Sequence, residues 1–166
     1  RVEGGVEVPI LDLYQVTGEE RLQRTQEYIE DLKVYTAKME EVHDQVHAGS
    51  DNTSVDYAYE DKNCILGASD IMLDTMLLSL PAQQILAGAG NSAQTLLDSL
   101  DAMEEMIDLF YQHKGLTEKE TDGSNAISVK DRYPSMHLNI RYQRMFAGAF
   151  MYASGNHVGI EWNETR

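Results

Sequence analysis

The residue types best suited to hold a metal ion occur together near the end of a long helical pattern: Glu40, His43, Asp44 and His47. Glu40 and His43 have the Glu-x-x-His spacing of di-iron helical bundles, and His43 and His47, four residues apart, share one face of a helix. The di-iron arrangement needs a second Glu-x-x-His and two further inward glutamates, which the other predicted helices do not supply. Glu40, His43 and His47 are therefore a candidate metalloenzyme site, and a hydrogen-bonded histidine at the edge of a core is the structural alternative.

A second candidate is the oxygen-rich segment ETDGSNAISVKD, residues 120–131. Its side chains match alternating ligand positions of an EF-hand calcium loop. The matching oxygen ligands are Glu120, Asp122, Ser124 and Asp131. Asp131 replaces the bidentate glutamate, and Asn125 replaces the glycine of the turn. The segment predicts a calcium site, with a polar, turn-rich loop as the alternative; no other cofactor is expected.

Motifs for covalent or nucleotide chemistry are absent from the sequence. It has no Gly-x-Ser-x-Gly, no phosphate-binding loop, no dinucleotide fingerprint and no haem-attachment motif. The single cysteine, Cys64, cannot form an internal disulfide. These observations favour a protein that is not an enzyme.

The charge balance restricts the partners. The chain has 28 acidic and 13 basic residues, a net charge of −15, and the negative charge is spread along its whole length. Nucleic acid and anionic lipid are disfavoured because each needs a basic surface. A basic protein surface is the favoured partner. No apolar run reaches 18 residues, so direct membrane insertion is not expected.

Hydrophobic spacing predicts an all-α protein with one domain. We expect an extended N-terminal arm over 1–16, an up-down-up-down four-helix bundle over 17–155 and an extended C-terminal tail over 156–166. The four predicted helices cover about 18–48, 55–79, 82–114 and 135–154.

Pro81 decides whether the apolar segments on either side of it form one continuous helix or two separate helices. Proline inside a helix costs about 3 kcal/mol, whereas proline in the first turn of a new helix costs almost nothing. From Leu86 to Phe110 the apolar residues recur at steps of three and four. The pattern therefore predicts a corner at Pro81 and an antiparallel helix pair on either side of it.

Two stretches give a family resemblance: YAYEDKNCILGASDIMLDTMLLSLP (57–81) and LLDSLDAMEEMIDLFYQHKG (96–115). The shared features are an acidic start, a small-residue centre, a proline corner and a Leu-Asp pair. They are carried here by Glu60, Asp61, Ala68, Ser69, Asp74, Pro81, Leu100 and Asp101. With these features the chain resembles the PsbQ family of extrinsic photosystem II subunits.

The resemblance implies a non-catalytic role on the lumenal face of photosystem II. Such a subunit would dock on the photosystem core and its other extrinsic proteins, stabilise the oxygen-evolving cluster and help to retain calcium and chloride. It implies a chloroplast protein of the thylakoid lumen, and the start at Arg1 fits a protein that has lost a targeting leader. The alternative is a soluble ligand- or calcium-binding helical bundle, such as an extracytoplasmic sensor domain.

Overall fold

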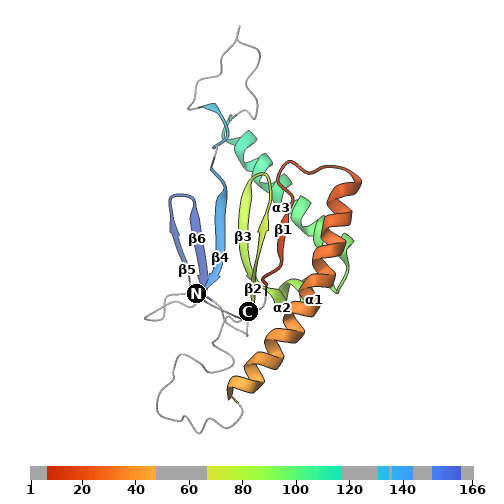
Figure 1. Ribbon diagram of the computed structural model, residues 1–166. Coiled ribbons are helices and arrows are strands. Elements are labelled where there is room, and N and C mark those ends of the chain that lie inside the picture. Colours follow the sequence, from red (N-terminus) through yellow and green to blue (C-terminus); the bar gives the residue numbers. More distant parts are fainter. Residues whose placement is uncertain (1–6, 48–66, 117–130, 135, 144–150, 162–166) are drawn as a thin grey trace, which may run out of the picture.

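The structure is a computed structural model that describes residues 7–47, 67–116, 131–134, 136–143 and 151–161 (Figure 1). Within these ranges the chain forms both helices and strands, in the order β1-α1-β2-β3-α2-α3-β4-β5-β6. The strands are β1 (Ile10–Asp12), β2 (Ala68–Met72), β3 (Met76–Pro81), β4 (Leu138–Gln143), β5 (Met151–Ser154) and β6 (His157–Glu161). The helices are α1 (Glu19–His47), α2 (Ala82–Ala89) and α3 (Ala93–His113).

The strands form one mixed sheet in the order β1-β2-β3-β4-β6-β5. The β1–β2, β3–β4 and β4–β6 pairs are parallel, whereas β2–β3 and β5–β6 are antiparallel hairpins. The register places Leu11, Ile71, Leu78, Ile140 and Val158 in one row across the sheet. Directly paired side chains point to the same face, so this row marks the face that is apolar along most of its length.

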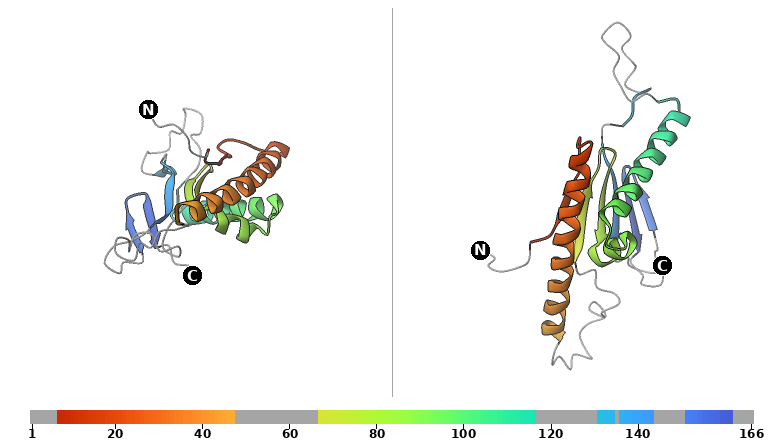
Figure 2. Two further views of the ribbon diagram at one scale, coloured as in Figure 1. Left: turned by 60° about the horizontal axis from the view of Figure 1, so that its bottom comes forward. Right: turned by 90° about the vertical axis from the view of Figure 1, so that its right-hand side faces the viewer.

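All three helices pack against that apolar face. Figure 2 shows α1 and α3 side by side on one side of the sheet, with β5 and β6 extending beyond them. Tyr28, Ile29 and Leu32 of α1 form one core with Leu97 and Leu100 of α3. None of the helices in the described ranges is long and apolar enough to cross a bilayer.

The helices cover the sheet unevenly. We call β1, β2 and β3 the covered half, because their residues on the helix side are almost all fully buried, as Leu11, Ile71 and Leu78 are. We call β4, β6 and β5 the open half, because the corresponding residues of β4 and β6, such as Ile140 and Ile160, are only partly buried. The apolar face of the sheet therefore continues past the layer of helices.

The predicted four-helix bundle is wrong, and the helix predicted over 55–79 is the clearest error. Its described part forms β2 and β3, which Asp74 and Thr75 join in a tight hairpin closed by Leu73 N–H donating to Met76 O at 2.9 Å. Both faces of these strands carry apolar residues, since Met72 and Leu77 occupy the side opposite the core. A nearly continuous apolar run hides the two-residue period of a strand and resembles one wide helix face.

The helix predicted over 135–154 is also wrong, because its described residues form β4 and β5. In β4 the apolar residues Leu138, Ile140 and Tyr142 alternate with polar ones, as in a strand with one buried face. Gly155, directly after the predicted helix, is the first residue of the two-residue loop between β5 and β6, with φ of 60°. Glycine there lets the loop adopt the twist of a hairpin.

The helix predicted over 82–114 is broken in two. Gly90 ends α2 in the left-handed conformation, with φ of 56°, and Asn91 follows at 59°. Ser92 then begins α3, where its Oγ accepts a hydrogen bond from Thr95 N–H at 3.2 Å. These are the usual end and start signals of separate helices, and the three-four apolar spacing continues across them.

Of two further expectations about the chain path, one is matched by the structure and one is matched only in its position. A helix, α1, does occupy Glu19–His47, in the region predicted as 18–48. Pro81 does mark a change of element, but it is the last residue of β3, and α2 begins at Ala82. The turn at Pro81 therefore joins a strand to a helix rather than two antiparallel helices.

Candidate functional site

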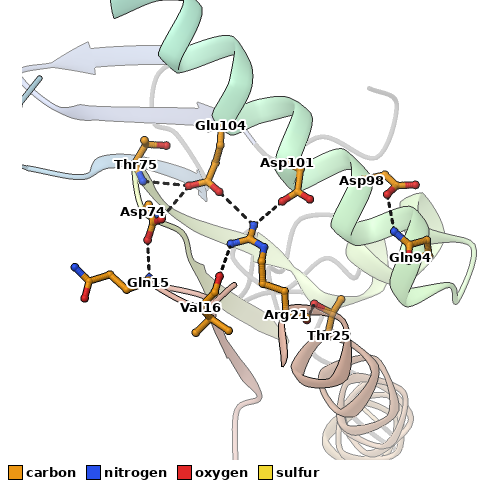
Figure 3. Close-up of polar contacts among 10 residues, drawn as sticks. All are labelled: Gln15, Val16, Arg21, Thr25, Asp74, Thr75, Gln94, Asp98, Asp101 and Glu104. Carbon is orange, nitrogen blue, oxygen red and sulfur yellow. Dashed lines mark hydrogen bonds and ion pairs between the residues drawn. The ribbon is translucent and has the colours of Figure 1, made fainter. Parts of the chain in front are cut away.

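One polar network fixes the position of α3 relative to α1 and to the β2–β3 turn (Figure 3). The Arg21 guanidinium contacts Asp101 Oδ1 at 2.5 Å and Glu104 Oε2 at 3.2 Å, and donates to Val16 O at 3.3 Å. The side chains of Arg21 and Glu104 are only 14% and 16% exposed. Ion pairs with this little exposure are screened less by water and salt than surface pairs are.

The same glutamate also holds the turn between β2 and β3. Glu104 Oε1 accepts hydrogen bonds from the backbone N–H of Asp74 at 2.8 Å and of Thr75 at 3.3 Å. Asp74 Oδ1 in turn accepts from Gln15 N–H at 2.6 Å. Because Arg21 and Glu104 are engaged by the protein itself, we assign this network to architecture and not to ligand binding.

A buried hydroxyl pair fastens β1 and β2 to α1. Ser69 Oγ donates to Pro9 O at 2.5 Å, so its single proton is used, and Tyr28 O–H then donates to Ser69 Oγ at 2.8 Å. Burial raises the pKa of Tyr28 to about 12, against a smaller lowering by the hydrogen bond with Ser69. Tyr28 is therefore a neutral structural group at physiological pH.

The open half ends in a short edge strand. Among the strands that the structure describes, β5 pairs with β6 alone, and all four of its residues are exposed. The Tyr152 ring lies over Gly159 of β6 so closely that a methyl group there would overlap the ring. An edge strand of this kind has backbone N–H and C=O groups that face outward, to which an extended peptide can add as a further strand.

The open half also borders an apolar groove on the helix side of the sheet. The groove has a volume of about 390 Å³. Its floor runs from β3 across β4 to β6 and consists of Leu78, Leu80, Ile140, Tyr142 and Ile160. Met103 of α3 forms one wall, and Ile85 of α2 closes one end. The surface that is free to bind something therefore lies next to β5 and not at the Arg21 network.

The described lining of the groove includes no residue of α1, the helix that carries Glu40, His43 and His47. The backbone places His43 and His47 in the last turns of α1, at the end that extends past the strands in Figure 1, and nothing is described of their side chains or that of Glu40. Within the described ranges no three His, Cys, Asp or Glu side chains come together as a metal site.

The predicted calcium loop cannot be compared with the structure. Glu120, Asp122 and Ser124 lie outside the described residues, and only Asp131 is within them, where it is exposed. Both candidate ion sites therefore stay predictions.

The sequence prediction missed β5 and the groove, although signals for the strands themselves were present. Ser154-Gly155-Asn156-His157 has a Gly-Asn pair between two strand-like stretches, which is a typical hairpin signal. The alternation of Leu138, Ile140 and Tyr142 is a strand signal of similar strength.

Comparison with known proteins gives a fold likeness only. No profile of a known protein family matches the sequence, and no curated protein matches it. Among solved structures, the M60 catalytic domain of ZmpC from Clostridium perfringens, in complex with the sialyl T antigen, superposes with a TM-score of 0.58 at 18% identity over 97% of this chain. The catalytic module of the metalloprotease ZmpA from the same organism gives 0.55 at 18% over 96%. The ZmpB metallopeptidase, also from C. perfringens, gives 0.55 at 16% over 98%.

These likenesses contradict the resemblance to the PsbQ family. The chain spans about a quarter of the length of each of these three structures, and they share its mixed α/β fold. A photosystem II extrinsic subunit of the expected kind requires a four-helix bundle, which the described residues do not form. The expectation of a non-catalytic protein is likewise contradicted, since the similar ZmpC domain and ZmpA module are catalytic. The thylakoid-lumen localisation depended on that resemblance alone.

Proposed function

We propose that this chain is part of the catalytic domain of a metallopeptidase, in which β5 binds an extended stretch of the substrate. The observation that carries the proposal is the fold likeness, over 96–98% of the chain, to the catalytic domains of three C. perfringens metallopeptidases. The chain corresponds to only a quarter of the length of those structures. We therefore propose that it forms part of such a domain and not the whole of it.

The position of β5 supports its role in substrate binding. It is the last strand of the sheet, it is exposed along its length, and the groove of the open half lies beside it. Adding a substrate strand to such an edge fixes the direction and register of a peptide through backbone hydrogen bonds, whatever its side chains are. A peptidase needs its substrate held in this extended form.

The described residues do not fit a catalytic metal, because no three ligand side chains meet among them. We therefore derive no metal-dependent step. His43 and His47 have the four-residue spacing with which two histidines of one helix bind zinc in metallopeptidases, and Asp44 stands where that motif has glutamate. They are the candidates in this chain for metal binding. The zinc content of His43→Ala and His47→Ala variants, compared with that of the unchanged protein, tests them.

Peptide hydrolysis by the full polypeptide that contains this chain tests the proposed function. The substrates are a fluorogenic peptide library and sialylated O-glycopeptides, the latter because ZmpC was solved with the sialyl T antigen. We expect cleavage that 1,10-phenanthroline abolishes and added zinc restores. If the zinc-loaded, folded polypeptide cleaves none of these substrates, the proposal is wrong.

Substrates with N-methylated backbone amides test the role of β5. Each lost backbone hydrogen bond costs about 0.5–1.5 kcal/mol, so methylation at alternate positions is expected to raise KM about 2- to 10-fold, with the intervening positions unaffected. Tyr152→Pro and Ala153→Pro are the matching protein variants, because adjacent amides of a strand point to opposite sides. A KM that none of these changes raises would rule out strand addition.

A further inference from the structure

The two flanks of α3 have opposite chemistry. Asp101 and Glu104 face α1, where both contact Arg21. Met103 faces the other way and forms a wall of the groove above β4 and β6. A helix turns 100° per residue, so Met106 and Phe110, three and seven residues after Met103, follow it along the same flank.

This second flank is apolar but remains exposed. Met106 is 59% exposed and Phe110 54% exposed, although both are large hydrophobic residues. Across the groove, Met151 of β5 is 54% exposed, and its pairing with Ile160 places it on the helix side of the sheet. The groove is thus flanked by exposed apolar residues on both sides, Met106 and Phe110 of α3 and Met151 of β5, whereas single exposed apolar residues are ordinary on a protein.

The width of this surface matches one α-helix. Three neighbouring strands, β4, β6 and β5, span about 10 Å between the outer two, and a helix with its side chains is about 10–12 Å across. On the covered half, α1 and α3 lie side by side in one layer on the sheet (Figure 2). A further helix beside α3 would extend this layer across the open half.

We infer that the groove beside α3 binds an amphipathic helix from another part of the same polypeptide. The inference rests on the proposed function in one respect: the similar catalytic domains are about four times as long as this chain, so the domain has further segments to supply the helix. Asp98 and Glu105 are exposed on the solvent side of α3, about 80–160° around the helix axis from Met103, Met106 and Phe110. The docked helix is therefore held by its apolar stripe, and these carboxylates stay in solvent.

Methionine oxidation of the full polypeptide tests the docking. The protein is exposed to dilute hydrogen peroxide, folded and in 6 M guanidinium, and each methionine is followed by mass spectrometry. We expect Met106 and Met151 to react at least fivefold more slowly in the folded protein. Met136, 63% exposed and not among the groove residues, is the matched control and is expected to react at nearly the unfolded rate. Unprotected Met106 and Met151 would overturn the inference.

Cross-linking identifies what covers the groove. In a Cys64→Ser background, Met106→Cys and, separately, Met151→Cys are labelled with a benzophenone maleimide and irradiated. Cross-links to a segment of the same molecule with apolar residues at three- and four-residue steps support the inference. Cross-links between two isotopically distinct copies would overturn it in favour of self-association. Neither readout depends on hydrolysis: a protected groove without peptidase activity refutes the proposed function alone, and activity with a reactive groove refutes the docking alone.

Discussion

The covered and open halves of the sheet are built from similar strands and differ in what lies on them. Ile71 of β2 is fully buried under α1 and α3, whereas Ile160 of β6 occupies the same face and is only partly buried. The apolar pattern of a strand therefore predicts which face will be covered, but not whether the covering element lies in the same part of the chain. In this protein the difference separates a fully covered core from an apolar surface that we propose another segment covers.

The largest effect is expected when an isoleucine is replaced by alanine in the covered half, and the same substitution in the open half is its comparison. Ile71→Ala removes a fully buried side chain and is expected to lower the free energy of unfolding by about 2–5 kcal/mol. Ile160→Ala in the same 166-residue chain is expected to cost about 1 kcal/mol or less, because less of its surface is buried. Urea denaturation followed by circular dichroism measures both. Equal losses would mean that the halves do not differ as described.

The second prediction concerns the network that holds α3 in place at the covered half. Arg21→Met removes the cation shared by Asp101 and Glu104 and is expected to cost about 1–3 kcal/mol. Arg24→Met is the matched control, since Arg24 pairs with Glu20 and donates to Asp12 O at 3.0 Å, both at exposed sites, and its loss should cost about 1 kcal/mol or less. A cost for Arg24→Met that matches that for Arg21→Met would contradict the architectural role of the network.

The third prediction concerns the corner that places α3 at the border between the halves. Gly90→Ala forces a side chain into the left-handed conformation and is expected to destabilise by about 1–2 kcal/mol. Gly88→Ala lies inside α2 with open space around it, and is expected to stabilise by up to about 1 kcal/mol. Thermal unfolding distinguishes the two, because the expected changes in Tm have opposite signs. Changes of the same sign would show that α2 and α3 are not separate helices.

The smallest expected effect comes from the buried Tyr28. Its pKa is raised by burial to about 12, above the usual value near 10, so the folded state favours the neutral form. Stability from this group is complete below pH 10 and is lost as the pH rises toward 12. Tyr28→Phe should flatten the alkaline fall in urea stability between pH 9 and 11.5. Tyr35 and Tyr111, whose pKa values burial also raises, will keep part of that fall. An unchanged slope in Tyr28→Phe would contradict this assignment.

The sequence predicted what local signals determine. α1 lies where the three-four spacing predicted a helix, and the chain changes element at Pro81 as proline chemistry requires. Residues 68–81 were misassigned because Met72 and Leu77 add apolar side chains to the second face of β2 and β3. Without a visible period of two, such a run is equally consistent with a buried helix.

The candidate site could not be predicted from the sequence, for a different reason. The groove combines Met103 of α3 with Ile140 and Ile160 of two strands, and no local pattern indicates that these residues meet. β5 is significant because it ends the sheet, which depends on the order β4-β6-β5 and not on the composition of its four residues. The hairpin signal at Gly155 and Asn156 could have predicted the strands, but not their order.

The pairing of β1 with β2 has a consequence for how the chain assembles during synthesis. Ile10 pairs in parallel with Asp70, sixty positions later, whereas β2 and β3 are joined by a two-residue turn. At roughly 5–20 residues per second, a ribosome makes β2 about 3–12 s after β1. During that interval β1 and α1 have no sheet to join, so the β2–β3 hairpin must act as the template onto which the older segment folds back.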